Sequence, residues 1–419
     1  MTRRTDTGPD VDPICLFENR LAGWSLRLDN PVGRIAVHHR SELPAAWNAI
    51  EAARQAGHWV ALLLDYELGE WLDDSALPTP RLDVDPEALP RLTALVFARA
   101  REQGPRDRAP ESPATDVRTL PEPAAQPGWA ASTKPDRRIR SDRTPADHAH
   151  AIDSIRAGIA RGDYYQVNYT VPLQLDWPDD LDPAGVYRQL IEHHPVAQAA
   201  CIRDGDRWIL SLSPELFVAR HGSRLLTRPM KGTAPRHADP AHDSRSAQGL
   251  LHSAKNRAEN LMIVDLLRND LGRIAVPGSV RVPALFNLER YPSVWTLTSS
   301  VQAEAPDVPL RDVLQALFPC GSVTGAPKIA AIRAIRALED RRRGIYCGSV
   351  GWLAPDGDFS LNVAIRTIEL RDGQAQFGVG GGIVSDSLAG EEWQECLWKA
   401  RILNGWTIDD TLAITPRPD

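Results

Sequence analysis

One lysine of this 419-residue chain lies in an unusual setting for a charged side chain. Lys231, in TRPMKGTAPR, stands between apolar Met230 and flexible Gly232. The preceding run LFVARHGSRLLTRPM predicts two strands around a His-Gly turn, with Glu215 on the opposite arm (231 − 215 = 16). A desolvated lysine becomes a nucleophile, and a carboxyl with a raised pKa can protonate a leaving oxygen. A cross-strand Lys–Glu ion pair is the structural alternative.

Acidic residues on two predicted helices form a second candidate site. In KNRAENLMIVDLLRNDLGR, Glu259 shares a helical face with apolar residues, which is costly unless a cation neutralises the carboxylate. In EEWQECLWKARIL, Glu392, Glu395 and Lys399 follow at spacings of three and four, on one side of a helix. Two carboxylates that meet across a cleft suit Mg²⁺. The alternatives are an Arg or Lys partner for Glu259 and a surface pair between Glu395 and Lys399.

Two segments could bind an anion. The run GVGGGIVSDS places Gly380, Gly381 and Gly382 after a predicted strand, where bare backbone N–H groups can bind a carboxylate. A bulged strand end is the alternative, and the dinucleotide-binding fingerprint is not matched. Arg366, in DFSLNVAIRTIEL, is predicted inside a strand, where it must either form an internal salt bridge or bind an anion.

A third segment, CGSVTGAPKIAAIRAIRALE, predicts a helix that begins near Pro327, with Thr324 or Gly325 as its cap. The positive end of this helix could face an anion, although an ordinary capped helix explains the pattern equally well. The spacing of a phosphate-binding P-loop is absent.

The overall composition excludes several classes of protein. The chain is 42% hydrophobic and 25% charged with a net charge of −7, which argues against nucleic-acid binding. The five cysteines are widely spaced without a CxxC pair, so neither a disulfide framework nor a zinc site is predicted. The chain begins without a signal-peptide pattern, and no run approaches the length of a membrane span. We therefore expect a cytoplasmic protein that binds neither nucleic acid nor a membrane.

The elements that must position these residues fall into three parts. We predict an N-terminal region over 1–105, a proline-rich linker or loop over 106–140, and a catalytic region over 141–407. In the last part, strands and helices interleave and most strands are joined by short turns. This arrangement favours an α+β fold with antiparallel sheets.

Taken in order, these motifs resemble those of the chorismate-utilising enzymes, a family that includes anthranilate, aminodeoxychorismate, isochorismate and salicylate synthases. The motifs are GDYYQVNYT (162–170), SPELF (213–217), RPMKGT (228–233), ENLMIVDLLRNDLGRI (259–274), GSVTGAPK (321–328), IYCGSVGW (345–352), AIRT (364–367) and GGGIVSDS…EEWQE (380–395). The resemblance implies a two-layer α/β sandwich of large antiparallel sheets, with helices outside and the site between the sheets.

The resemblance also implies roles for individual residues. Glu259 and Glu395, with Glu392 beside them, would hold Mg²⁺, which binds the ring carboxylate of chorismate. The residues implied to contact substrate are Gly232, Thr233, Tyr346, Arg366, Gln166, Lys399, Gly380, Gly381 and Gly382.

Lys231 indicates the branch of the family, because anthranilate synthases usually carry PIAGT where aminodeoxychorismate synthases carry PIKGT, and this chain has PMKGT. The implied mechanism begins when Lys231 attacks C2 of the ring while Glu215 helps the C4 hydroxyl leave as water. Ammonia then adds at C4 and expels the lysine, giving 4-amino-4-deoxychorismate on the folate route to 4-aminobenzoate. Isochorismate and salicylate synthases carry a water-activating Lys where this chain has Gln166, so ammonia is the expected nucleophile.

The same resemblance implies two partners. A separate glutamine amidotransferase is expected to supply ammonia, since no nucleophile-bearing GxCxG motif occurs in the chain. A separate lyase is expected to complete the route to 4-aminobenzoate.

Two alternatives remain open. An anthranilate synthase component I would leave Lys231 idle and would work with Thr296 where anthranilate synthases have a His used in the loss of pyruvate. A catalytically silent tryptophan-binding or scaffold subunit is the alternative of another class, since relatives hold tryptophan in the N-terminal half.

Overall fold

The computed structural model describes residues 14–72, 89–104, 137–291 and 294–412. The helices are α1 (Leu43–Gln55), α2 (Gly69–Leu72), α3 (Pro145–Arg161), α4 (Pro183–His193), α5 (Pro240–His252), α6 (Ala254–Gly272), α7 (Leu310–Leu317), α8 (Lys328–Leu338) and α9 (Ala389–Ala400). The strands are β1 (Cys15–Asn19), β2 (Trp24–Val37), β3 (Trp59–Leu64), β4 (Leu92–Gln103), β5 (Arg138–Arg140), β6 (Gln166–Leu175), β7 (Gln198–Asp204), β8 (Arg207–Ser213), β9 (Leu216–His221), β10 (Arg224–Arg228), β11 (Met230–Pro235), β12 (Arg281–Arg290), β13 (Val294–Glu304), β14 (Gly325–Ala326), β15 (Ser349–Leu353), β16 (Phe359–Asn362), β17 (Thr367–Arg371), β18 (Gln374–Ile383) and β19 (Thr407–Ile408).

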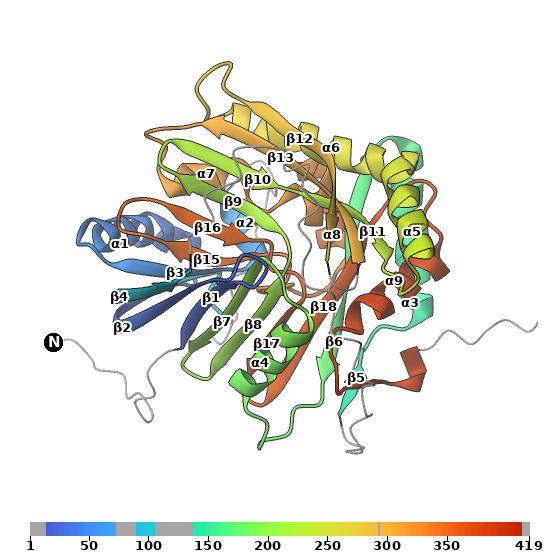
Figure 1. The fold of residues 1–419 in the computed structure, drawn as a ribbon, viewed down its shortest axis with the longest axis horizontal. Helices are drawn as coiled ribbons and strands as arrows, with labels where there is room; N and C mark the ends of the chain where they lie inside the picture. Colours follow the sequence, from blue (N-terminus) through green and yellow to red (C-terminus); the bar gives the residue numbers. More distant parts are fainter. Residues whose placement is uncertain (1–13, 73–88, 105–136, 292–293, 413–419) are drawn as a thin grey trace, which may run out of the picture.

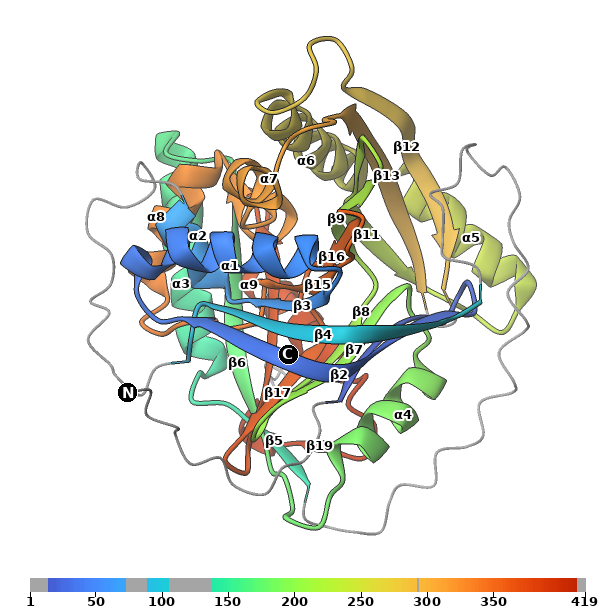
Figure 2. The same ribbon diagram turned by 90° about the vertical axis from the view of Figure 1, so that its left-hand side faces the viewer.

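The strands form one long series of neighbours. The series runs β12-β13-β10-β9-β16-β15-β3-β4-β2-β1-β7-β8-β17-β18-β6-β5-β19, with β11 also paired to β13 and β14 to β6. Within the described residues every pairing is antiparallel except that of β5 with β19. Helices pack on the strands, with α1 against β2 and β3, α4 against β7 and β8, and α5 and α6 against β11 and β13 (Figures 1 and 2). The predicted α+β class with antiparallel sheets is confirmed.

The chain crosses between distant parts of this series at two adjacent places. Strands β8 and β9 are consecutive in sequence but pair with different neighbours, and the same holds for β16 and β17. The two crossings are bonded to each other, because Val363 N donates to Glu215 O over 3.0 Å and Leu212 N donates to Arg366 O over 2.9 Å. Two predicted site residues, Glu215 and Arg366, therefore lie where the sheet changes direction.

Local signals in the sequence set several element boundaries, and the predicted His-Gly turn is confirmed. The His-Gly turn joins β9 and β10, with His221 opposite Arg224. Helix α3 begins after the N-cap Thr144 and ends at Gly162, whose φ of 83° is left-handed and favours glycine. Local capping and turn chemistry thus set these boundaries.

Most of the predicted linker lies outside the described residues, but its last residues do not fit the prediction. Arg138–Arg140 form β5, which pairs with β6 through Ile139 and Leu175. Ile139 is buried, so this short segment belongs to the sheet rather than to a linker. In the described part of the chain, none of the helices is both long enough and apolar enough to cross a membrane.

A buried ion pair completes one edge of β6. Arg343 Nη2 donates to Glu339 Oε1 over 2.7 Å and to Asn168 O over 2.7 Å. Glu339 Oε1 in turn accepts from both the backbone N and the hydroxyl of Thr170 over 3.0 Å. Side chains therefore satisfy backbone groups of β6 that a neighbouring strand would otherwise bond.

We predict that Arg343→Met lowers the free energy of unfolding by about 3–5 kcal/mol, because the buried Glu339 carboxylate loses the guanidinium that balances its charge. The two side chains are 1% and 3% exposed, so water cannot replace the lost partner. Urea denaturation measures the change. Arg268→Met is the matched control, since its pair with Asp265 is more than half exposed and is worth about 0–1 kcal/mol. Equal losses in both variants would contradict the assignment.

Candidate active site

A cavity of about 270 Å³ brings together residues from most of the motifs. Its lining includes every predicted site residue except Gln166: Glu215, Lys231, Gly232, Thr233, Glu259, Tyr346, Arg366, Gly380, Gly381, Gly382, Glu392, Glu395 and Lys399. The lining comes from both sheet crossings, from β11 and β18, and from α6 and α9. Residues nearly two hundred positions apart in sequence thus line the same cavity.

Lys231 lies in β11, where a bulge shapes the backbone. The register against β13 shifts between Lys231 and Thr233, and Gly232 has a φ of 81°. A Cβ added at Gly232 would lie 2.8 Å from the side chain of Asn256, so only glycine fits. The half-buried Lys231 amine donates to Ser322 O over 3.1 Å. The bulge therefore turns the Lys231 side chain into the cavity.

Glu215 lies close to Lys231, although not by the predicted hairpin pairing. Arg228 of β10 pairs with Leu216, whereas Lys231 belongs to β11 and pairs with Leu297 of β13. The prediction of opposite arms is therefore wrong, because the hairpin ends before the lysine and β11 joins another strand. Glu215 nevertheless faces the cavity from the sheet crossing.

The Glu215 carboxyl is almost fully buried, with an exposed fraction of 3%. Burial raises its pKa to about 7, although a hydrogen bond from Ser322 and the charge of Lys231 oppose the rise. The Ser322 hydroxyl donates to Glu215 Oε1 over 2.7 Å. A carboxyl that is half protonated near neutral pH can act as a general acid.

Arg366 is not inside a strand, contrary to the sequence prediction. It lies in the bend between β16 and β17 with a φ of 50°, where Ala364 N donates to Gly348 O and Arg366 O accepts from Leu212 N of β8. Its guanidinium makes no hydrogen bond or ion pair to any residue that the structure describes. Burial lowers its pKa, and the charge of Tyr291 opposes this. The predicted internal salt bridge is absent there, so the site offers an arginine to an anion.

The three successive glycines lie within β18, not after a strand as predicted. Gly380, Gly381 and Gly382 pair with Thr170, Tyr169 and Asn168 of β6. The pairing of β18 with β17 ends at Phe377 in the described chain, so beyond this point the other edge of β18 faces the cavity. A Cβ added at Gly382 would lie 2.8 Å from Gln166 Nε2 and 3.3 Å from Lys231 Nζ, so the absence of side chains makes room for them.

Gln166 is the predicted residue that does not line the cavity. It is 0% exposed and lies next to Gly382 at the start of β6. Neither its amide oxygen nor its amide nitrogen has a hydrogen-bond partner in the described structure. An unpaired buried amide costs free energy, which points to a polar group that the protein itself does not supply.

Three carboxylates face the cavity from α6 and α9. Burial raises the pKa of Glu259 and of Glu392, and the negative charge of Glu395 adds to both rises. The charge of Lys399 lowers the pKa of Glu395, and the Glu395 Oε1 to Lys399 Nζ distance is 2.7 Å. Lys399 also donates to Gly380 O over 2.6 Å. The i, i+4 pair predicted as the alternative for this helix is thus present.

Among the described residues, no group of three or more His, Cys, Asp or Glu side chains is close enough to form a metal site. The donor chemistry nevertheless fits a hard cation, because Glu392 Oε2 and Glu395 Oε1 both lie near Gly381 and Glu259 senses the charge of Glu395. These carboxylates repel one another, and a divalent cation would relieve that repulsion.

Sequence reasoning missed the residue that joins the two central groups. Ser322 contacts Glu215 through its hydroxyl and Lys231 through its carbonyl oxygen. It lies in the GSVTGAPK motif, where the sequence pattern predicts only a helix cap. That cap is wrong, because Gly325 and Ala326 pair with β6 as β14, and α8 starts at Lys328 with Pro327 before it.

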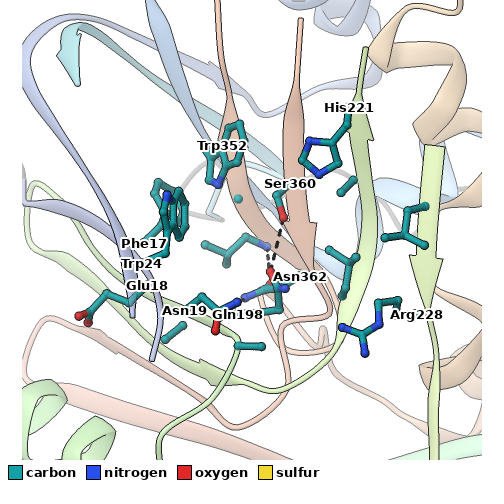
Figure 3. A pocket seen from close by; sticks show the side chains of 17 residues that line it. Phe17, Glu18, Asn19, Trp24, Gln198, His221, Arg228, Trp352, Ser360 and Asn362 are labelled. Atoms are coloured by element: carbon teal, nitrogen blue, oxygen red, sulfur yellow. Dashed lines mark hydrogen bonds between the residues drawn. The ribbon is translucent and has the colours of Figure 1, made fainter. Parts of the chain in front are cut away.

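A second cavity lies away from these residues, between β1, β7, β9 and β16 (Figure 3). Its walls carry Phe17, Trp24 and Trp352 together with the polar side chains of His221 and Arg228. None of the predicted site residues lines it. The predicted site therefore does not extend into this second cavity.

Comparisons with known proteins agree with the geometry. The sequence model of the chorismate binding enzyme family matches residues 13–405. Aminodeoxychorismate synthase component 1 of Salmonella typhimurium is 43% identical over 267 residues, which are 63% of this chain and 58% of that protein. Anthranilate synthase component 1 of Streptomyces coelicolor is 38% identical over 296 residues, or 68% of this chain and 57% of that protein. The aligned part thus spans less than two thirds of each relative.

Solved structures give the same fold. Anthranilate synthase component I of Streptococcus pneumoniae superposes with a TM-score of 0.74 at 25% identity, covering 91% of this chain and 92% of that one. A putative isochorismate synthase of Bacillus anthracis has a TM-score of 0.72 at 19% identity over 94% and 95% of the two chains, a likeness of fold alone. Because the family match spans nearly all of the described residues, this chain belongs to the chorismate binding enzyme family.

Proposed function

We propose that this chain aminates chorismate at C4 with ammonia to give 4-amino-4-deoxychorismate, on the folate route to 4-aminobenzoate. The observation that carries the proposal is the position of Lys231, whose amine enters a cavity shared with the buried acid Glu215. The name of the Salmonella relative, aminodeoxychorismate synthase component 1, supports it.

The proposed chemistry has two displacements. The Lys231 amine forms a bond to ring C2, the double bond shifts, and the C4 hydroxyl leaves as water with the proton of Glu215. Ammonia then forms a bond to C4, the double bond shifts back, and the lysine leaves as an amine. The enolpyruvyl group is untouched, so the enzyme acts as an amino-group transferase rather than as a pyruvate-releasing lyase.

Gln166 supports ammonia as the second nucleophile. Its unpartnered amide lies beside Gly382, the glycine that also adjoins Lys231 Nζ. An amide cannot take a proton from water as a base does, but it can accept a hydrogen bond from ammonia. We infer that a glutamine amidotransferase supplies the ammonia and that a separate lyase acts on the product.

We infer that Mg²⁺ binds at Glu259 and Glu395, with Glu392 beside them. Bound there, the ion would supply positive charge to a carboxylate of the substrate. The protein residues already shape this end of the cavity, since Lys399 fixes the Glu395 carboxylate and Gly381 leaves space beside it.

The anthranilate synthase alternative finds less support at Thr296. This residue is 1% exposed, and its hydroxyl donates to Gly232 O over 3.1 Å, so it stabilises the bulge after Lys231. A threonine engaged in this way is no acid or base for the loss of pyruvate. The silent-subunit alternative would leave Gln166 and Arg366, whose side chains have no hydrogen-bond partner among the described residues, without a role.

Product analysis tests the proposal. The chain is incubated with chorismate, ammonium and Mg²⁺, and products are separated before and after adding a lyase that converts aminodeoxychorismate to 4-aminobenzoate. We expect 4-aminobenzoate only after the lyase, and no product when a chelator removes the metal. Anthranilate formed without the lyase would support the first alternative, and chorismate binding without turnover would support the second.

We expect Arg366→Lys to raise the KM for chorismate by about 10- to 100-fold, since a lysine cannot reproduce the two parallel hydrogen bonds of a guanidinium to a carboxylate. The kcat at saturation should change less, because the arginine contacts no reacting atom in the proposed chemistry. Steady-state kinetics decides the matter. Arg371→Lys is the control, since this arginine is partly exposed and lies outside the cavity lining. An unchanged KM for the Arg366 variant would refute the role.

A further inference from the structure

Ser322 lies between the two residues that carry the proposed chemistry. Its hydroxyl is 2.7 Å from Glu215 Oε1, and its carbonyl oxygen is 3.1 Å from Lys231 Nζ. The contact with the acid is shielded from water, because Ser322 is 4% exposed and Glu215 3%. One residue thus contacts the amine with one atom and the carboxyl with another.

The loop around Ser322 is held from two sides. The next carbonyl oxygen, that of Val323, accepts from the buried Arg343 Nη1 over 3.0 Å. On the preceding side, a Cβ added at Gly321 would lie 2.4 Å from Leu266 of α6, so the loop packs directly on that helix. These contacts fix the backbone that carries Ser322, so its side chain stays within reach of Glu215.

We propose that Ser322 is a positioning residue of this site: its hydroxyl orients the Glu215 carboxyl while its carbonyl oxygen holds the Lys231 amine beside it. The inference rests on the proposed function for the identity of the reaction, whereas the contacts do not depend on it. Ser322 itself makes and breaks no bond to the substrate.

The charges around Glu215 predict the effect of removing the hydroxyl. Lys231 faces Glu215 from β11, and the Cys320 thiol faces it from the loop of Ser322. The Ser322 hydrogen bond and the Lys231 charge both lower the pKa of Glu215, against burial, which raises it to about 7. Without the hydroxyl, the pKa of Glu215 should rise further. A general acid works only while protonated, so the loss of activity on the alkaline side should move to higher pH.

The test compares Ser322→Ala with Ser349→Ala across a pH series with saturating ammonium. Ser349 is the matched control, because it is 0% exposed and its hydroxyl donates to a backbone oxygen, Asn362 O, over 2.6 Å. We expect S322A to lower kcat about tenfold or more, with an unchanged KM for chorismate and the descending limb shifted to higher pH. The S349A variant should keep the wild-type pH profile.

A second readout does not depend on turnover. Carbon-13 NMR of protein labelled at glutamate carboxyls, with the signal assigned by Glu215→Gln, follows the titration of Glu215 directly. We expect a higher pKa in S322A than in wild type. Ser322→Cys, which keeps a weaker donor of similar size, should show a smaller shift and replaces S322A if that variant does not fold.

Coincident titrations and coincident pH profiles of S322A and wild type would overturn the positioning role. The same shift in S349A would also overturn it, because the effect would then follow from any lost buried hydroxyl. A wild-type chain that yields no aminated product would refute the proposed function instead, and the NMR titration would still decide the role of Ser322.

Discussion

Lys231→Ala is expected to lower the rate of aminodeoxychorismate formation by about 10³-fold or more, because the variant lacks the amine that bonds to the ring. In the wild type, the Lys231 amine donates to Ser322 O and lies near Gly382 in the cavity. The methyl group of alanine cannot reach this position. The rate is measured with chorismate, ammonium and an excess of the coupling lyase. Anthranilate is assayed in the same samples, since a small residue at this position is usual in anthranilate synthases.

Lys231→Arg separates nucleophilicity from charge. Arginine keeps the positive charge that acts on Glu215 and Glu259, but its guanidinium stays protonated and cannot attack carbon. We expect the two variants to be similarly slow while both retain the melting temperature of the wild type within a few degrees. If Lys231→Arg formed aminodeoxychorismate at nearly the wild-type rate, the positive charge alone would be sufficient. That result would exclude the covalent step.

The second large effect is expected for Glu215→Gln, which should lower kcat by about 10²- to 10⁴-fold through the loss of proton donation. The amide keeps the size of the carboxyl and can still accept the Ser322 hydrogen bond, so the cavity should be preserved. A chorismate KM close to that of the wild type would confirm that binding is intact.

The wild-type pH profile provides the companion measurement. The pKa of Glu215 is raised to about 7 by burial, so the acid is protonated below that pH and loses its proton above it. Activity limited by this acid therefore falls as pH rises through about 7, and the limb is absent from the residual activity of the Gln variant. A limb that persists unchanged in Glu215→Gln would assign the titration to another group.

Periodicity and turn chemistry predicted α6, α9 and the turn between β9 and β10 correctly. The apolar positions of α6, and the His-Gly turn between β9 and β10, depend on neighbours within a few residues. Such patterns can be interpreted from the sequence because they do not depend on contacts with distant parts of the chain. The assembly of one cavity from residues 215–399 is predicted instead by the family resemblance, because spacing in sequence does not reveal which helices meet.

The wrong predictions share one cause, which is the tertiary bonding of backbone groups. The alternation around Arg366 is typical of a strand, but the carbonyl of Arg366 bonds to β8 and the chain bends there. The residues proposed to cap α8 pair with β6 instead. Ser322 was overlooked for the same reason, since its partners lie 107 and 91 residues away.

The account depends most on a covalent bond between Lys231 and the substrate ring. The direct measurement is mass spectrometry of protein mixed with chorismate and Mg²⁺ in the absence of ammonia, quenched in acid and digested. We expect the peptide that contains Lys231 to gain the mass of chorismate less one water, and the gain to disappear on adding ammonium or in Lys231→Ala. A wild-type enzyme that aminates chorismate while this peptide stays unmodified under every quench condition would contradict the account.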